Sequence, residues 1–469
     1  MDNEKYISEI VANVIKSINA GGEVKTSAAT HKKGVFTSMT DALQAVNKAY
    51  NELKNYSVAQ SEEMIKNIRR LTLEEAETMA VMGVKETGMG NVNDKIIKHQ
   101  LVAKKTPGTE DLKPSVMTGD AGLTLVEMAP YGVIGSITPS TNPSETVICN
   151  SMGMIAGGNG VVFNPHPNAK DVANYAVDLV NRAVLEAGGP ENIVVSVENP
   201  TKESSDEMMQ SPIVRMLVAT GGPGVVKALL SSGKKAIGAG AGNPPVIVDD
   251  TADVLKAAKD IVDGASFDNN LPCIAEKECF AFNNIADTLI TEMQKHGAYL
   301  IKGDEIQKLM DTCLVNKDGK YSINKKWVGK DAYKFLEAIG INAPAGTKLI
   351  ICETDASHPF VQVELMMPIL AIVRVNDIDE AIAKACQAEH GNRHSAHIHS
   401  KNVDHLSKFA KAVETTIFVK NAPSYAGIGA GGEGYTTFTI AGPTGEGLTA
   451  AHSFTRSRRC VLVDGLHIV

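Results

Sequence analysis

The sequence predicts an α/β protein of two or three domains. Its 469 residues are more than one hydrophobic core usually organises. Short apolar strands alternate with amphipathic helices, as in the strand Val161–Phe163, the helix Ala169–Glu186 and the strand Ile193–Val197. The loop Thr220–Gly224 follows another strand and opens a helix, a position that favours anions such as a dinucleotide phosphate. An ordinary tight turn is the alternative for this loop.

Helices and strands alternate along most of the chain. Helices are expected first over Met39–Asn55 and Ser61–Met82, followed by an exposed hairpin near Ser115–Met128. The pattern then predicts the elements Gly132–Ile137, Val161–Phe163, Ala169–Glu186, Ile193–Val197, Ser204–Gln210, Val214–Ala219, a helix ending at Ser232, Val246–Val248 and Ala252–Ala265. This order is typical of βαβ units, which form parallel sheets.

The N-terminal residues 4–18 are predicted to form a separate amphipathic helix. Its apolar side chains recur at helical spacing: Ile7, Ile10, Val11, Val14, Ile15 and Ile18. Gly21-Gly22 ends the helix, and a polar linker follows. A short helix is marginal alone in water, so it needs a partner. Its mixed charges favour a protein groove over a membrane surface, and packing against its own domain is the alternative.

Composition limits the classes of function. The formal net charge is −8 and no long basic run is present, which argues against nucleic-acid binding. No stretch approaches the roughly 18 apolar residues of a membrane span, and the N-terminus lacks a secretory signal. The seven cysteines are scattered and form no CxxC pair, which indicates free thiols in a reducing cytoplasm.

Cys273 is the cysteine whose local sequence points to chemistry. Asn269, Asn270 and Pro272 break the chain before it, and a helix-capable run is expected after it. A bend there can present the sulfur to a cleft, where its thiolate is a strong nucleophile. The alternative is a small buried thiol with no reactivity.

Polar residues in two other segments are candidates for ligand contacts. The loop Thr138–Pro143 follows an apolar strand, and ligands of open α/β sheets bind at such strand ends. In that loop Asn142 offers an amide N–H for an oxyanion, or forms a simple Asx turn. Glu364 lies among apolar residues and either binds a ligand hydroxyl or is a solvated carboxylate at a strand end.

A cluster of histidines invites a metal interpretation, which the pattern disfavours. The cluster consists of Cys386, His390, His394, His397 and His399. Gly391-Asn392 interrupts it, His394–His399 resembles a strand, and no second cysteine pair completes a ligand set. We therefore expect no metal site, and predict histidines that pack in the sheet or lie near the thiolate.

Together these residues resemble the aldehyde dehydrogenase superfamily from about Phe36 to Val469. The ordered series is Thr141-Asn142-Pro143, Gly158-Asn159-Gly160 leading to Asn164-Pro165, Thr220-Gly221-Gly222, Cys273, and Glu364 with Pro368. The chain is most similar to the CoA-acylating branch, through Pro165-His166-Pro167, Ala239-Gly240-Ala241-Gly242-Asn243-Pro244-Pro245, Phe267-Asp268-Asn269-Asn270 and, more weakly, Pro443-Thr444-Gly445-Glu446-Gly447.

The resemblance implies an aldehyde dehydrogenase-like α/β fold with a Rossmann-type cofactor domain, an α/β catalytic domain and a small oligomerisation arm. The implied divisions are a helix at 1–19, a linker at 20–35, a cofactor domain at 36–241 with a hairpin at about 112–131, a catalytic domain at 242–440 and an oligomerisation segment at 441–469. A homodimer or homotetramer is implied. The look-alikes work in bacterial microcompartments, where such an N-terminal helix is an encapsulation signal, so residues 4–18 are expected to bind a shell or core protein.

The resemblance also assigns roles to site residues. Cys273 is expected to be the nucleophile and Asn142 the oxyanion donor, acting on a short-chain aldehyde such as propionaldehyde or acetaldehyde. The residues expected to bind NAD are Thr138, Pro139, His166, Thr220, Gly221, Gly222 and Glu364. NAD is favoured over NADP because no Arg or Lys directly follows the strand Val161–Phe163. CoA is expected as the co-substrate.

Two positions depart from the hydrolytic members of the superfamily. Ala239 stands where those enzymes carry a water-activating glutamate, so the acyl-enzyme should be slow to hydrolyse and CoA should accept the acyl group. Glu276 and Glu278 remain possible substitute bases. Asn164 replaces a ribose-binding lysine. The alternatives are a hydrolytic enzyme that forms a carboxylic acid and a non-catalytic microcompartment cargo adaptor.

Overall fold

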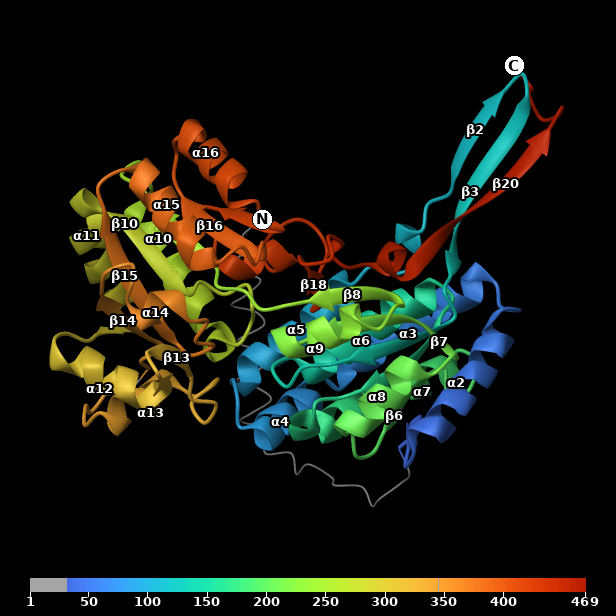
Figure 1. Cartoon of the computed structure of the whole chain (residues 1–469), viewed down its shortest axis with the longest axis horizontal. Helices are drawn as coiled ribbons and strands as arrows, with labels where there is room; N and C mark the ends of the chain where they lie inside the picture. The colour runs from blue at the N-terminus through green and yellow to red at the C-terminus, as the bar shows by residue number, and fades with distance from the viewer. Residues whose placement is uncertain (1–31, 345) are drawn as a thin grey trace.

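The computed structural model describes residues 32–344 and 346–469 and shows two α/β lobes with a projecting arm (Figure 1). The predicted helix at residues 4–18 and most of the linker at 20–35 lie outside the described residues. Each lobe contains one parallel sheet covered by helices, and the arm is a separate antiparallel sheet. The described residues contain no helix with the length and apolar content needed to cross a membrane.

The first lobe is a doubly wound sheet of six parallel strands. In spatial order these are β1 (Val35–Phe36), β6 (Val194–Val197), β5 (Gly160–Asn164), β4 (Val133–Ile137), β7 (Val214–Thr220) and β8 (Lys235–Ala239). Buried side chains of α2 (Met39–Leu53), α8 (Lys202–Gln210) and α9 (Pro223–Leu230) pack on one face. The opposite core includes α3 (Val58–Glu74), α4 (Ala76–Thr87), α5 (Val92–Lys105), α6 (Pro143–Ala156) and α7 (Lys170–Glu186).

The strand order reverses between β4 and β7. From β4 the chain adds β5 and then β6 on one side, where the earlier strand β1 forms the edge, whereas β7 and β8 lie on the other side. Ligands of open α/β sheets bind at such a switch point, outside the carboxyl ends of the strands. The register pairs Ile137 with Ala219, so the loops that begin at Thr138 and Thr220 start close together.

The second lobe is a seven-stranded parallel sheet. Its spatial order is β11 (Ala298–Leu300), β14 (Leu349–Glu353), β15 (Ile369–Val375), β10 (Glu278–Phe282), β9 (Pro245–Val248), β16 (Ser395–His399) and β17 (Ile417–Lys420). Its helices are α10 (Val254–Ser266), α11 (Asn283–Lys295), α12 (Asp304–Cys313), α13 (Ala332–Ala338), α14 (Pro359–Gln362), α15 (Ile378–Glu389) and α16 (Val403–Val413). Two smaller ladders pair β12 (Leu314–Lys317) with β13 (Lys320–Ile323) and β18 (Ile440–Ala441) with β19 (Gly447–Leu448).

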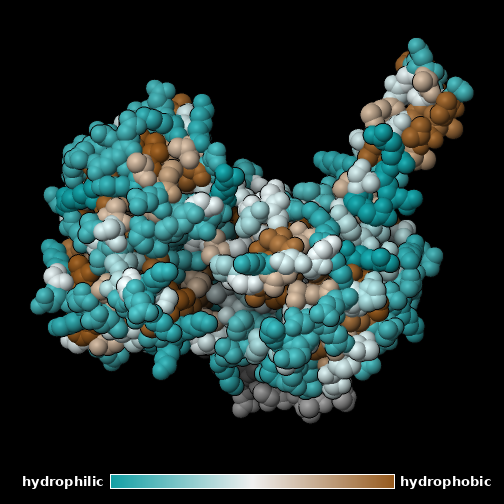
Figure 2. All heavy atoms as spheres, in the orientation of Figure 1, coloured by the Kyte–Doolittle hydropathy of each residue, from teal (hydrophilic) through white to brown (hydrophobic). Residues whose placement is uncertain are grey.

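The arm joins the predicted hairpin to the C-terminal end of the chain. β2 (Ser115–Gly119) and β3 (Gly122–Pro130) form the hairpin, and β20 (Thr455–Val463) pairs antiparallel with β3 along its whole length. Figure 2 shows apolar surface on the arm, where Val116, Met117, Val461, Leu462 and Val463 are exposed. An apolar sheet that stands clear of its own core is the kind of surface that another chain covers.

Three local predictions need correction. The helix predicted over Ser61–Met82 is two helices, because Glu75 leaves helical geometry and its carboxylate accepts bonds from Arg182 and Tyr175 on α7. The run after Cys273 is not helical but leads into strand β10, where its side chains are buried in the sheet. Helix α5 was not predicted, since lysines occupy part of its buried face.

Candidate active site

Cys273 follows a sharply turned loop. Asp268, Asn269 and Asn270 have φ values of 47°, 55° and 65°, the left-handed region that Asp and Asn tolerate better than other side chains. Each side chain is bonded: Asn269 donates to the Gly329 carbonyl at 2.9 Å and Asn270 to the Ala265 carbonyl at 2.8 Å. The Asp-Asn-Asn sequence therefore supplies both the conformation and the hydrogen bonds that shape this loop.

A buried lysine, Lys277, binds the same loop through its ammonium group. Lys277 donates to the Asn270 carbonyl at 2.9 Å, to the Asn270 side-chain oxygen at 2.6 Å and to the Pro272 carbonyl at 3.3 Å. Burial lowers the pKa of Lys277, and the carboxylate of Glu364 opposes that effect. Lys277 thus fixes the backbone immediately before the nucleophile candidate, a role that the sequence interpretation missed.

The Cys273 thiol is protonated in the free protein at neutral pH. Burial, and then the carboxylate of Glu364, raise the pKa of this half-buried thiol to about 12. The ammonium groups of Lys277 and Lys98 act in the opposite direction. Burial and the Glu364 carboxylate outweigh the two ammonium groups, so the sulfur rests in its weakly nucleophilic thiol form.

Asn142 lies at the N-cap of α6, in the loop after β4, and is only 6% exposed. Its side-chain oxygen accepts a hydrogen bond from Lys98 at 2.7 Å, and its side-chain nitrogen donates to Thr141 at 3.2 Å. Lys98 on α5 is fully buried and also pairs with Asp268 at 2.6 Å. One ammonium group therefore contacts both the predicted oxyanion donor and the loop that leads to Cys273.

The expected cofactor residues from the first lobe meet at the switch point. Thr138 and Pro139 follow β4, while Thr220 ends β7 and Gly221 and Gly222 lead from it into α9. The Thr138 hydroxyl is buried without a hydrogen-bond partner, and a Cβ built on Gly221 or Gly222 meets no atom within 4 Å. An unsatisfied buried hydroxyl beside open glycine backbone fits a polar ligand, as a dinucleotide would be.

Thr220 differs from this pattern because its hydroxyl is used inside the protein. It shares a hydrogen bond of 2.8 Å with the Thr439 hydroxyl, which in turn donates to Asn150 at 3.1 Å. Its backbone remains at the switch point. We therefore expect Thr220 to contact a dinucleotide through its backbone and not through its side chain.

Glu364 lies in the loop between α14 and β15 of the second lobe. Burial raises the pKa of its carboxyl group, opposed by Lys277 and by the backbone N–H of Gly242. Because its charge acts on both Cys273 and Lys277, Glu364 belongs to the same electrostatic cluster as the thiol.

His166 and Asn164 follow β5 but behave differently. His166 is exposed, and its Nδ1 accepts the N–H of Asn168 at 3.1 Å. Partial desolvation by neighbouring groups, and then the charge of Lys325, lower the pKa of its ring. Asn164 is 5% exposed; it donates to the Thr201 carbonyl at 3.3 Å and accepts from Ser204 at 2.6 Å. Asn164 thus ties β5 to α8, while the His166 ring remains available to a ligand.

Ala239 ends β8, is 3% exposed, and accepts the Gly221 N–H through its carbonyl at 3.2 Å. The two acids considered as substitute bases are buried. Glu276 accepts the N–H of Ser424 at 2.9 Å, and burial raises the pKa of its carboxyl to about 8. Burial also raises the pKa of Glu278, which lies within β10.

Three histidines of the cluster are packed in and beside the second sheet, whereas His390 is exposed at the end of α15. His394, His397 and His399 are at most 2% exposed, and burial lowers the pKa of His394 and His397 to about 4, so both are neutral at pH 7. His397 bonds the Ile274 carbonyl at 2.9 Å, directly after Cys273. Across the part of the chain that the structure describes, no group of three or more His, Cys, Asp or Glu side chains is arranged to hold a metal.

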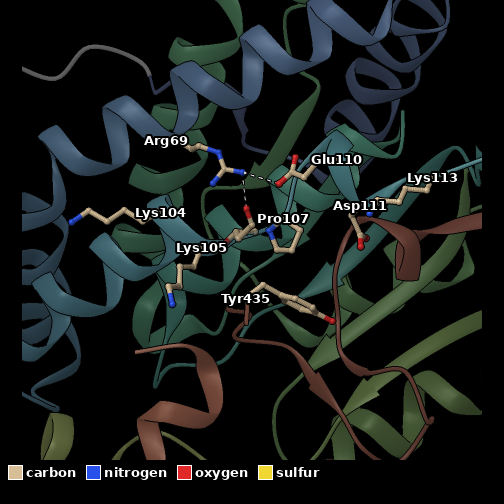
Figure 3. A pocket seen from close by; sticks show the side chains of 9 residues that line it. Arg69, Lys104, Lys105, Pro107, Glu110, Asp111, Lys113 and Tyr435 are labelled. Atoms are coloured by element: carbon tan, nitrogen blue, oxygen red, sulfur yellow. Dashed lines mark hydrogen bonds and ion pairs between the residues drawn. The ribbon is translucent and has the colours of Figure 1, made fainter. Parts of the chain in front are cut away.

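A cavity of about 570 Å³ lies at the C-terminal end of α5 (Figure 3). Two of its cations are bonded to backbone carbonyls: Arg69 donates to Ala103 and Thr106, and Lys105 donates to Gly429 and Gly432 at 2.7 and 2.8 Å. These contacts anchor the end of α5, the helix that carries Lys98.

Comparison with known proteins places this site in a family. The Aldehyde dehydrogenase family matches residues 13–438. The chain is 47% identical over 470 residues to the acetaldehyde dehydrogenase (acetylating) EutE of Salmonella typhimurium, covering 100% of both chains. It is 45% identical over 461 residues to the propanal dehydrogenase (CoA-propanoylating) of the same organism, covering 98% of each.

Solved structures agree with these relatives. A propionaldehyde dehydrogenase from the Clostridium phytofermentans fucose utilisation bacterial microcompartment superposes with a TM-score of 0.91 at 57% identity, over 93% of this chain and 100% of that one. A Rhodopseudomonas palustris propionaldehyde dehydrogenase, solved with bound CoA and an acylated cysteine, gives 0.91 at 55% identity, over 93% and 99%.

The chain belongs to the aldehyde dehydrogenase family. Within that family it is a CoA-acylating aldehyde dehydrogenase, as the resemblance implied. The predicted α/β fold is confirmed.

Proposed function

We propose that Cys273 and Asn142 carry out the chemistry of this CoA-acylating aldehyde dehydrogenase. The Cys273 thiol gives up its proton to solvent, and the thiolate attacks the carbonyl carbon of the aldehyde. The carbonyl oxygen becomes an oxyanion between the Asn142 amide and the backbone N–H of Cys273. The observation that carries this assignment is the shared ammonium of Lys98, which bonds Asn142 at 2.7 Å and Asp268 of the Cys273 loop at 2.6 Å.

NAD is the proposed hydride acceptor, and bound NAD would supply the redox chemistry. Gly221 and Gly222 would lie along its pyrophosphate, because open space faces their backbone and α9 begins there. Thr138 offers an unsatisfied hydroxyl on the neighbouring loop, followed by Pro139. Glu364 would hold the nicotinamide ribose and His166 would lie near the adenosine.

Transfer to CoA completes the proposed reaction. Loss of hydride leaves an acyl group on Cys273 as a thioester, and the CoA thiol attacks it to give acyl-CoA and free Cys273. One thioester replaces another of similar energy, so the free energy of aldehyde oxidation is kept in acyl-CoA. The overall reaction should therefore be reversible. With Ala239 at the end of β8, that residue supplies no carboxylate to activate water. One oxygen of Glu276 accepts the Ser424 N–H and the other is buried without a hydrogen-bond partner, so Glu276 stays the candidate for a substitute base.

Cys273→Ala tests the assignment of the nucleophile. The variant is expected to lose both NADH formation and acyl-enzyme formation, measured by absorbance and by intact mass. Retained CoA-dependent activity would refute the role of Cys273. The buried Cys279→Ala variant is the matched control, since that thiol lies inside β10 and should keep full activity.

The proposed substrate is propionaldehyde or acetaldehyde. Relatives named for each aldehyde are similarly close, at 45% and 47% identity. The two aldehydes differ by one methylene, which a pocket discriminates by only about 1–3 kcal/mol. Values of kcat/KM across an aldehyde chain-length series would assign the preference.

A bacterial microcompartment is the proposed location. One similar structure comes from the fucose utilisation microcompartment of Clostridium phytofermentans. Residues 4–18 have the amphipathic pattern of a segment that binds a shell or core protein. Fusing residues 1–19 to a fluorescent protein should direct it into microcompartments, and diffuse fluorescence would refute the proposal.

We also propose the domain division 36–241, 242–440 and 441–469, with the arm as the oligomerisation surface. The division is supported by the separate sheets, and the surface by the exposed apolar side chains of β2 and β20 (Figure 2). A homodimer or homotetramer would cover that surface.

A further inference from the structure

Lys98 is buried in the middle of a compact polar cluster between α5, α6 and the Cys273 loop. Three side-chain oxygens lie within 2.9 Å of its ammonium nitrogen: Asp268 at 2.6 Å, Asn142 at 2.7 Å and Glu145 at 2.9 Å. Its side chain is 0% exposed. Burial alone would lower the pKa of Lys98, but the carboxylates of Asp268 and Glu145 outweigh burial and raise it. The ammonium group is thus permanently charged.

This contact fixes which way the Asn142 amide points. An ammonium group has only N–H donors, so the amide atom that faces Lys98 must be the oxygen. A flip of the amide would place its NH₂ group against the cation and lose the 2.7 Å hydrogen bond. The NH₂ group is therefore held on the side away from Lys98, where one N–H donates to Thr141.

The same ammonium holds the nucleophile loop in register with the amide. Asp268 begins the three left-handed residues before Cys273, and its carboxylate binds Lys98 as well as Lys95 at 3.1 Å. Left-handed Asp and Asn residues are strained and persist only where contacts enforce them. Lys98 supplies one of those contacts at the point where the loop is strained.

We propose that Lys98 is a positioning residue that locks Asn142 with its N–H toward the oxyanion. The proposal rests on the proposed roles of Asn142 and Cys273. Oxyanion donors are worth most when they are oriented before the reaction, since no reorganisation is then needed.

The test replaces Lys98 without leaving an unpaired buried carboxylate. In Lys98→Met/Glu145→Gln one positive and one negative charge are removed together, and Lys95 remains paired with Asp268. Loss of an oriented oxyanion donor should lower kcat of CoA-dependent aldehyde oxidation by about 100-fold. KM for NAD should change by less than about threefold, because Lys98 touches no expected cofactor residue.

Non-additivity separates positioning from a general structural defect. If Lys98 acts through Asn142, the Lys98→Met/Glu145→Gln change should cost less than about threefold further in an Asn142→Ala background. Alkylation of Cys273 by iodoacetamide forms no oxyanion, so its rate should fall far less than kcat. Lys95→Met is the matched control: it removes a lysine from the same Asp268 without touching Asn142, and should keep kcat within about threefold.

The Lys98 and Asn142 variants test different roles. An unchanged kcat in folded Lys98→Met/Glu145→Gln, or an equal loss with and without Asn142, would overturn the positioning role alone. An Asn142→Ala variant with full activity would instead refute the proposed oxyanion donor. Should circular dichroism show that the first variant is unfolded, Lys98→Gln/Glu145→Gln replaces it; a glutamine still bonds Asp268 but lets the amide flip, and the same non-additivity is expected.

Discussion

The reactivity of Cys273 towards an alkylating agent should depend on pH as expected for a strongly perturbed thiol. With a pKa raised to about 12, roughly one thiol in ten thousand is ionised at pH 8, against roughly one in four for an ordinary cysteine. A more basic thiolate is also more nucleophilic. With a Brønsted coefficient of about 0.45, the thiolate of Cys273 should react roughly 40-fold faster than that of an ordinary cysteine. The net expectation is alkylation roughly 60-fold slower than that of an unstructured reference peptide.

The assay is iodoacetamide labelling of the full chain between pH 6 and 10, quantified by mass spectrometry of the Cys273 peptide. The rate should rise about tenfold per pH unit with no plateau, because the thiolate fraction grows throughout this range. Glu364→Gln should speed the reaction at every pH, since the neighbouring carboxylate helps to raise the thiol pKa. A plateau below pH 8 would show a resting thiolate and refute the electrostatic account.

Three further variants test hydrolysis of the acyl-enzyme, the stability of the folded chain and the oligomer interface. Ala239→Glu should raise carboxylic acid release, measured by chromatography with CoA omitted; no increase would mean that the missing base does not limit hydrolysis. Glu145→Gln should cost about 3 kcal/mol of unfolding free energy at pH 7, because Lys98 helps to hold the Glu145 pKa at about 2 in the folded protein against burial. That folded pKa is depressed, so the stabilisation is present above about pH 4.5 and lost towards pH 2, and urea titrations at pH 7 and pH 3 should show the difference shrinking. Leu462→Lys, on the exposed face of β20, should dissociate the oligomer in light scattering, whereas an unchanged mass would exclude the arm.

Much of the architecture was predictable because hydrophobic periodicity reports burial directly. The strand before Thr138, the strand before Thr220 and the hairpin near Ser115–Met128 all formed as expected. The break at Glu75 was not predictable, since it depends on Arg182, more than 100 residues away. Long-range ion pairs leave no local pattern.

The polar scaffold beneath the site was missed for the same reason. Lys95, Lys98 and His99 lie at core spacing on α5, which makes the helix look less amphipathic than it is. Glu145, the one charged residue of the buried helix α6, was the visible signal of a buried partner. A lysine at core spacing in one helix and an acid within another buried helix together predict a buried ion pair before the fold is known.

The central claim is that the acyl group formed on Cys273 leaves on CoA. Its most direct test is intact mass spectrometry of the protein mixed with propionaldehyde and NAD in the absence of CoA. We predict a burst of about one NADH per chain and an acyl adduct on the Cys273 peptide, which disappears as acyl-CoA forms once CoA is added. Continuous NADH production without CoA, with carboxylic acid as the product and no adduct, would contradict the account.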